Sequence, residues 1–124
     1  MGKFAVKKTS NEGYAFTIVA NNGEVVGVSQ TYKSRDAMNN GIESVRKNAN
    51  VEIEDQTLEN VVEKPCPKWE IYFDKAREYR FRLKASNGEI ILAASEGYTT
   101  RASAKNGIES VQKNADSEIV VDDA

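Results

Sequence analysis

The chain has 124 residues and a formal net charge of -2, with 40% hydrophobic and 29% charged residues, as in an ordinary soluble globular protein. It contains no histidine and one cysteine, Cys66, which excludes intrachain disulfides, histidine-based triads and the usual zinc sites. Because it shows no apolar leader and no apolar run near the ~18 residues of a membrane span, we expect a cytoplasmic protein that does not contact membranes.

Three strands are predicted first. Residues 4–8 alternate apolar and polar side chains, the period of a strand. The next strand carries its apolar side chains on one face, and these are Tyr14, Phe16, Ile18 and Ala20. Asn22-Gly23 then predicts a type I′ turn, because both of its central residues need a positive φ. Residues 24–29 follow as the third strand.

A helix comes next. Ser34 is a suitable N-cap for a helix that runs to about Ala49. Apolar side chains recur on it at helical spacing, as expected for a face that packs on a sheet, and these are Met38, Ile42, Val45 and Ala49. Gly41 borders this stripe and indicates a close approach of helix and sheet, since a mid-helix glycine costs about 1 kcal/mol. Residues 51–53 read as a final short strand.

Residues 55–68 are predicted to be a linker. The segment is acidic and then carries Pro65-Cys66-Pro67, which resists regular secondary structure. After it the same order of elements returns, with strands at 69–73 and 79–85, a turn at Asn87-Gly88, a third strand at 89–95, a helix from Thr100 to Ala115 and a final strand at 118–121. Each half is therefore a β-β-β-α-β unit.

The two halves are copies of one another. Phe4 aligns with Trp69, and the six-residue block that begins at Asn40 is identical to the block that begins at Asn106. The second copy has one extra residue near Leu92-Ala93, which suggests a β-bulge there. On its helix the apolar stripe is Ala104, Ile108, Val111 and Ala115.

The duplication predicts one domain built from two repeats, residues 1–54 and 69–124. A unit of about 60 residues is marginal by itself, so we expect both halves to share one hydrophobic core. The natural arrangement is an internal pseudo-dimer with an approximate two-fold axis. We expect an α+β monomer with one antiparallel sheet and two helices.

The hairpin Asn-Gly-Glu, the following Ser-x-x-Tyr and above all the helix block Asn-Gly-Ile-Glu-Ser-Val resemble the YegP-like family. These are small bacterial and archaeal proteins of uncharacterised function, with one or two such repeats. The resemblance covers nearly the whole chain outside the linker. It implies β-β-β-α-β units paired into one continuous sheet, with the last strand of each unit exchanged onto its partner. It carries over no catalytic residue.

Three polar positions recur on both helices, opposite the apolar stripe, where packing does not require them. They are Asn40, Glu43 and Lys47 and their copies Asn106, Glu109 and Lys113. One interpretation is a polar recognition face present twice. The alternative is that Glu43 and Lys47 form an i,i+4 ion pair worth ~0.3–0.5 kcal/mol, retained from the duplication.

Tyrosines also recur before each helix, as Tyr32 and Tyr98. We expect their rings in the core and their hydroxyls hydrogen-bonded at the sheet edge, with a ligand-facing role as the alternative. Ser44 and Asn48 flank the apolar stripe of the first helix, and we expect them to be structural.

The second repeat has a basic stripe on the outer face of its sheet, formed by Tyr72, Arg80, Arg82 and Lys84. A basic stripe beside an aromatic ring on an open sheet can hold single-stranded nucleic acid. Glu70 and Asp74 share this face, however, and the alternative is a ladder of cross-strand ion pairs.

Catalysis is not indicated. No carboxylate pair has a recognisable acid–base spacing, and Cys66 has no histidine to activate it. We therefore expect no enzyme activity, no cofactor and no metal. The favoured function is a binding module for a protein partner, and the alternative is a nucleic-acid-binding accessory protein.

Overall fold

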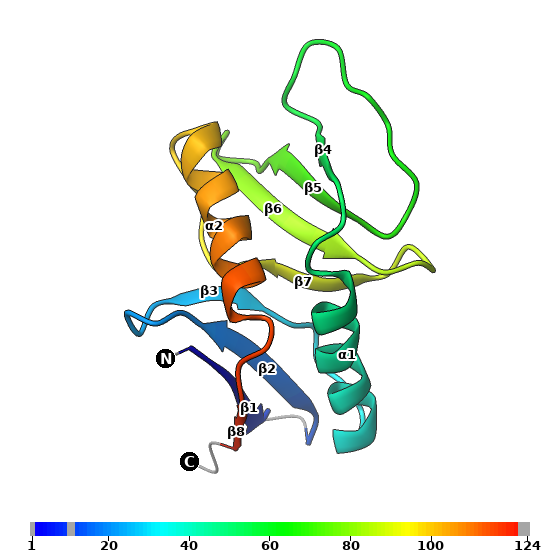
Figure 1. The fold of residues 1–124 in the computed structure, drawn as a ribbon, viewed down its shortest axis with the longest axis vertical. Coiled ribbons are helices and arrows are strands. Elements are labelled where there is room, and N and C mark those ends of the chain that lie inside the picture. The colour runs from blue at the N-terminus through cyan, green and yellow to red at the C-terminus, as the bar shows by residue number, and fades with distance from the viewer. Residues whose placement is uncertain (1, 10–11, 122–124) are drawn as a thin grey trace.

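The structure is a computed structural model that describes residues 2–9 and 12–121. It consists of one eight-stranded sheet with two helices over one of its faces (Figure 1). The elements of the first repeat are β1 (Lys3–Lys8), β2 (Tyr14–Val19), β3 (Val25–Val28), α1 (Arg35–Asn48) and β4 (Ile53–Asp55). Those of the second are β5 (Lys68–Phe73), β6 (Tyr79–Lys84), β7 (Ile90–Ala94), α2 (Arg101–Asn114) and β8 (Ile119–Val121).

The strand order is β4-β5-β6-β7-β3-β2-β1-β8. β3 and β7 pair antiparallel at the centre, with Gly27 opposite Ala94. Each last strand lies on the other repeat, since β4 pairs in parallel with β5 and β8 in parallel with β1. The predicted α+β fold with exchanged final strands is confirmed, but the sheet is only mostly antiparallel, because both exchanged strands pair in parallel.

Several boundaries differ from the sequence-based expectation by one or two residues. The strand expected at residues 51–53 begins at Ile53 and includes Asp55, and the strand expected from Glu118 begins at Ile119. Lys68 opens β5. The connection between the repeats therefore spans residues 56–67, which form the large loop near β4 in Figure 1.

One hydrophobic core runs through both repeats. Helix α1 packs against β2 of its own repeat and β7 of the other, and α2 packs against β6, β3 and β2. Both predicted helix stripes are buried, including Met38, Ile42, Ile108 and Val111. Because each helix covers strands of both repeats, neither half closes its core alone.

Both helices begin where the sequence predicts. The Ala37 N–H donates to the Ser34 hydroxyl at 3.0 Å, and the Ser103 N–H donates to the Thr100 hydroxyl at 3.0 Å. Both N-caps have extended backbone angles, as an N-cap requires. The caps satisfy N–H groups that have no partner inside the helix.

The predicted type I′ turns are wrong. Only the glycine of each Asn-Gly pair has a positive φ, 86° at Gly23 and 85° at Gly88. The Gly23 N–H donates to the Ala20 carbonyl at 2.9 Å, and the Ala20 N–H donates to the Glu24 carbonyl at 2.8 Å. The loop therefore has three residues, with a left-handed glycine in third position. Asn22 is the middle residue of this loop, and its side-chain amide nitrogen has no hydrogen-bond partner among the described residues.

The predicted bulge is not specific to the second copy. Register shifts occur between Ile18 and Val19 in β2 and between Leu83 and Lys84 in β6, so both repeats carry one at the same place. The extra residue of the second copy lies beyond these shifts, where β7 is one residue longer than β3.

The mid-helix glycines mark close contacts with the recurring tyrosines, in line with the predicted close approach. A Cβ built on Gly41 would lie 2.3 Å from the Tyr32 hydroxyl oxygen, and one built on Gly107 would lie 2.7 Å from that of Tyr98. The Tyr32 ring stacks on Phe16. The Tyr32 hydroxyl is buried without a hydrogen-bond partner among the described residues, so the expectation of a satisfied hydroxyl is wrong there.

Candidate binding clefts

The recurring polar residues of the helices face solvent, as predicted. All six of them are exposed, namely Asn40, Glu43, Lys47, Asn106, Glu109 and Lys113. The three of the first repeat line a space beside a hairpin of the other repeat, and of the three in the second repeat only Lys113 does so. The exposed surface of each helix thus forms one wall of a cleft, and a hairpin of the other repeat forms the opposite wall.

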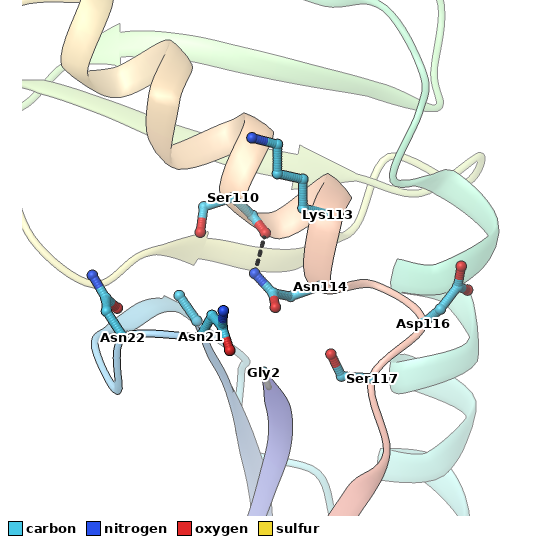
Figure 2. A pocket seen from close by; sticks show the side chains of 9 residues that line it. Gly2, Asn21, Asn22, Ser110, Lys113, Asn114, Asp116 and Ser117 are labelled. Atoms are coloured by element: carbon cyan, nitrogen blue, oxygen red, sulfur yellow. Dashed lines mark hydrogen bonds between the residues drawn. The ribbon is translucent and has the colours of Figure 1, made fainter.

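The first such space, cleft I, has a volume of about 680 Å³. One wall is the C-terminal end of α2 with the chain that follows it, and the other is the β2–β3 hairpin and the start of β1 (Figure 2). It is lined by Gly2, Ala20, Asn21, Asn22, Ser110, Lys113, Asn114, Asp116 and Ser117. Cleft I therefore combines a helix of the second repeat with a hairpin of the first.

The second space, cleft II, is its counterpart and has a volume of about 400 Å³. Here α1 of the first repeat faces the β6–β7 hairpin of the second. The lining residues are Asn40, Glu43, Ser44, Lys47, Asn48, Ala85, Ser86 and Asn87. Six positions line both clefts at equivalent places of the repeat, and in cleft II these are Ala85, Ser86, Asn87, Ser44, Lys47 and Asn48.

The hairpin asparagines have the same hydrogen bonds in both clefts. The Asn22 Oδ1 accepts from the Glu24 N–H at 3.0 Å, and the Asn87 Oδ1 accepts from the Glu89 N–H at 3.0 Å. This bond orients each side chain. Its amide nitrogen has no hydrogen-bond partner within the described ranges, so each asparagine offers donors to the cleft.

The helix asparagines, in contrast, form their hydrogen bonds through the amide nitrogen. The Asn114 Nδ2 donates to the Ser110 carbonyl at 2.7 Å (Figure 2), and the Asn48 Nδ2 donates to the Ser44 carbonyl at 2.9 Å. At least one N–H of each amide is therefore used within the helix, and the Oδ1 atoms remain as acceptors. These bonds agree with the structural role expected for Ser44 and Asn48.

Each cleft is lined by one lysine and one acidic residue. Lys47 and Lys113 have no ion-pair partner in the part of the chain that the structure describes. Cleft I also contains Asp116 and cleft II contains Glu43. Glu43 pairs with Arg46, so the expected i,i+4 pair with Lys47 is wrong. Arg46 is fixed beside Glu43 because it also binds main-chain carbonyls beyond α2.

A recess extends cleft II toward the sheet. It shares Asn40, Ser44, Ala85 and Asn87 with the cleft and is also lined by Tyr32. Burial raises the pKa of the Tyr32 phenol, the side chain of Gln30 lowers it in part, and the carboxylate of Glu89 raises it. The hydroxyl therefore stays protonated at neutral pH.

The two repeats have diverged at some exposed helix positions and not at others. On the exposed surface away from the clefts, Asp36 and Asn39 of α1 are replaced by Ala102 and Lys105 in α2. The cleft lysine, by contrast, is identical in both copies. The exposed helix positions thus include some that have diverged, whereas the lysine that lines both clefts has not.

Sequence reasoning found one wall of each cleft and missed the other. The helix residues were predicted, but Asn106 and Glu109 do not line cleft I, and the hairpin residues Asn22 and Asn87 were taken as turn formers alone. The recurrence of the same asparagine in both hairpins was the available signal. It could not be connected to the helices because the contact crosses between repeats.

The outer face of the second repeat brings its predicted residues together in a ladder of ion pairs. Arg80 pairs with Asp74 at 2.7 Å, and Arg82 pairs with Glu70 at 2.6 Å. Lys84 also reaches Glu70, at 3.3 Å. Arg82 lies over the Tyr72 ring, 4.2 Å from its centroid. Each of the three predicted cations is therefore engaged by a carboxylate.

This network extends to the edge of the sheet. Lys68 bridges Glu54 and Glu70 at 2.8 and 3.2 Å. Burial tends to raise the pKa of Glu54, but hydrogen bonds from Gln56, Lys68 and the Lys64 N–H outweigh it and lower that pKa to about 2. The pKa of Glu70 is likewise lowered, because its bonds to Arg82 and Lys68 outweigh its burial. The network therefore anchors the connection between the repeats.

Within residues 2–9 and 12–121, no group of three histidine, cysteine or acidic side chains is placed to hold a metal ion. Neither helix has the length and apolarity needed to cross a lipid bilayer.

Known proteins are similar to this chain in both sequence and fold. Residues 10–55 and 74–122 match a family described as a domain of unknown function, DUF1508. The UPF0339 protein YegP of Yersinia pestis is 34% identical over 122 residues, which cover 98% of this chain and 96% of that protein. A UPF0339 protein of Shewanella oneidensis, solved by solution NMR, superimposes with a TM-score of 0.79 at 29% identity, covering 98% of this chain and 92% of its own.

A shorter relative matches one repeat's length. A UPF0339 protein of Treponema denticola is 54% identical over 55 residues, which are 93% of that protein and 44% of this chain.

Proposed function

The chain belongs to the UPF0339 (DUF1508) family, whose function is unknown, and we propose that it is a non-enzymatic binding module that holds a protein partner in clefts I and II. The proposal gives a role to the polar surface that the two repeats share. It makes no use of catalysis, a cofactor or a metal ion.

The observation that carries the proposal is the agreement of exposed residues in the two clefts. Lys47 and Lys113 are exposed and lack ion-pair partners among the described residues, so neither packing nor pairing explains their identity. The neighbouring exposed pair Asn39 and Lys105 has diverged. A shared binding task accounts for both facts.

The nucleic-acid alternative has less support. Arg80, Arg82 and Lys84 are paired with carboxylates, and releasing them for phosphates would leave the buried Glu70 with fewer cations than it has now. If the alternative held, an oligonucleotide titration would show a log-log salt slope near -2 to -3 for about three phosphate contacts.

The test compares two variants of the whole chain. Lys47→Gln/Lys113→Gln removes both cleft ammonium groups, and Asp36→Asn/Lys105→Gln changes exposed charges of the same helices away from the clefts. Each protein is used to capture a partner from cell extract, and the partner is identified by mass spectrometry, purified and titrated by calorimetry.

We expect the cleft variant to bind the purified partner at least about tenfold more weakly, or about 1.4 kcal/mol, and the control variant to bind like the original chain. Equal binding by the cleft variant, with both variants folded by circular dichroism, would remove the clefts from the interaction.

A further inference from the structure

Cleft II carries an unmatched positive charge. Two of its lining side chains are charged, Lys47 and Glu43. The Glu43 Oε2 lies 2.5 Å from the Arg46 Nη1, and the same guanidinium donates to the carbonyls of Ala115 and Ser117 at 3.2 and 2.7 Å. Because these bonds fix Arg46 beside Glu43, the charge of Glu43 is already neutralised. The Lys47 ammonium has no ion-pair partner among the described residues.

Hydrogen-bond donors line both walls of cleft II. The Asn87 Oδ1 accepts from the Glu89 N–H at 3.0 Å, which orients the side chain and leaves its amide nitrogen without a partner among the described residues. The Ser86 hydroxyl on the same hairpin has no hydrogen bond within those residues either. On the helix wall the Ser44 Oγ accepts from the Asn48 Nδ2 at 3.3 Å and keeps its own proton to donate. The lysine ammonium thus lies among neutral donors.

A carboxylate is the anion that best fits these groups. When ionised it only accepts hydrogen bonds, and its one negative charge matches the one unpaired ammonium of the cleft. A phosphorylated side chain carries nearly two charges at neutral pH, and proteins that recognise it use clusters of arginine. The arginine beside cleft II, Arg46, is already engaged by Glu43 and two carbonyls. Cleft II therefore favours an acidic side chain over a phosphate group.

Cleft I has the equivalent lysine and hairpin asparagine but a different charge. Lys113 and Asn22 line it where Lys47 and Asn87 line cleft II. Asp116 also lines cleft I, and its carboxylate has no ion-pair partner within the described residues. Figure 2 shows Asp116 on the side of the cleft away from Asn22. Its charge weakens the attraction of cleft I for an anion without occupying the lysine.

We propose that each cleft binds the carboxylate of an aspartate or glutamate side chain of the partner protein, and that cleft II binds it more tightly than cleft I. The lysine supplies the charge, and the hairpin asparagine supplies oriented amide N–H groups. This proposal rests on the proposed function and specifies the group that the clefts recognise. The net charge of -2 gives the chain no general attraction for acidic proteins, so the attraction is local to the clefts.

The probe is the capped peptide acetyl-Ala-Glu-Ala amide, titrated into the ¹⁵N-labelled full-length chain and followed by NMR. Its matched control is acetyl-Ala-Gln-Ala amide, which has nearly the same shape and no charge. We expect the side-chain amide signals of Asn87 and Asn22 to shift with the glutamate peptide, and the dissociation constant to be about twofold smaller at Asn87. The glutamine peptide should bind each cleft at least about tenfold more weakly.

Single lysine variants separate the two clefts. Lys47→Gln should weaken binding at Asn87 at least about tenfold and leave binding at Asn22 unchanged, and Lys113→Gln should do the reverse. Lys105→Gln is the matched control, because it removes an exposed lysine of α2 that lines neither cleft. It should change neither dissociation constant.

Two further variants test the charge of the clefts. Asp116→Asn gives cleft I the neutral residue that the first repeat has at Asn50, and it should tighten binding there about twofold. Asn87→Asp keeps the oxygen that accepts from the Glu89 N–H, loses the amide N–H groups and adds a negative charge. Followed at the main-chain amide of Ser86, it should weaken binding in cleft II at least about tenfold.

Equal binding of the glutamate and glutamine peptides, or an unchanged dissociation constant in both lysine variants, would overturn the proposal. So would tighter binding of acetyl-Ala-phosphoserine-Ala amide than of the glutamate peptide. Equal affinities of the two clefts that Asp116→Asn does not alter would overturn their ranking. If these titrations fail while Lys47→Gln/Lys113→Gln still loses the purified partner, the proposed function stands and the carboxylate recognition is wrong.

Discussion

The indole N–H of Trp69 donates to the main-chain carbonyl of Ala49, the C-cap residue of α1, at 2.9 Å. The equivalent carbonyl at the end of α2, that of Ala115, is satisfied differently. It accepts from the Arg46 Nε at 3.2 Å, and the Arg46 guanidinium lies 5.3 Å from the centroid of the Phe4 ring. Phe4 stands where the second repeat has tryptophan, and it has no N–H to offer. The two repeats thus satisfy equivalent C-cap carbonyls with different donors, Trp69 in one case and Arg46 in the other.

Trp69→Phe should destabilise the protein by about 1–3 kcal/mol, the cost of a buried carbonyl that loses its donor. Adding Gln112→Arg, which places arginine at the position equivalent to Arg46, should recover at least half of that loss. The free energy of unfolding in urea measures both. Gln112→Arg alone should have little effect, because Trp69 already satisfies Ala49. A double variant no more stable than Trp69→Phe would contradict this account.

The β5–β6 turn stores backbone strain that can be relieved. Arg77 has φ 63°, a left-handed conformation that costs a non-glycine residue about 1–2 kcal/mol. Arg77→Gly should therefore raise the free energy of unfolding by about 1 kcal/mol. Gly88→Ala should lower it by a similar amount, since Gly88 has φ 85° and an added Cβ would meet nothing within 4 Å. Thermal unfolding of both variants tests whether the φ angle alone determines if a substitution stabilises or destabilises the protein. A loss of stability in Arg77→Gly would show that it does not.

The Glu54 network predicts a loss of stability in acid. The pKa of Glu54 is lowered from 4.5 to about 2 in the folded protein. Above pH 4.5 its hydrogen bonds contribute fully. As the pH falls from 4.5 toward 2, the unfolded chain takes up a proton that the folded chain does not, so the contribution is lost.

Glu54→Gln should therefore be less stable than the original chain at pH 7, by about 2 kcal/mol for hydrogen bonds to a charged group. The difference should shrink as the pH falls below 4.5. Urea unfolding between pH 7 and pH 3 measures it, with Glu59→Gln, an exposed change in the same connection, as the control. A difference that stays constant with pH would assign the effect to packing instead of charge.

Local patterns in the sequence were sufficient to predict the strands, the helices and their caps. Alternation placed Phe16 and Ile18 in the core, and the side chains of Ser34 and Thr100 determine where the helices start. These features depend on neighbours within a few residues. The turn at Asn22-Gly23 was misassigned because the same dipeptide suits two loop lengths, and the choice depends on which residues pair across the hairpin.

The clefts could not be predicted for a different reason. Lys113 and Asn22 are far apart in the sequence and come together only because α2 packs across β3 and β2 of the other repeat. The periodicity of the sequence does not indicate how α2 packs on the other repeat. The repeated polar residues identified the helix surface, and the three-dimensional arrangement supplied the hairpin that faces it.

The exchanged final strands make the relation between the two repeats reciprocal. β4 pairs with β5 as β8 pairs with β1, so the last strand of each repeat lies beside the first strand of the other. Which repeat comes first along the polypeptide is then immaterial to the packing. After a cut within residues 56–67, each fragment would still supply an edge strand to the other.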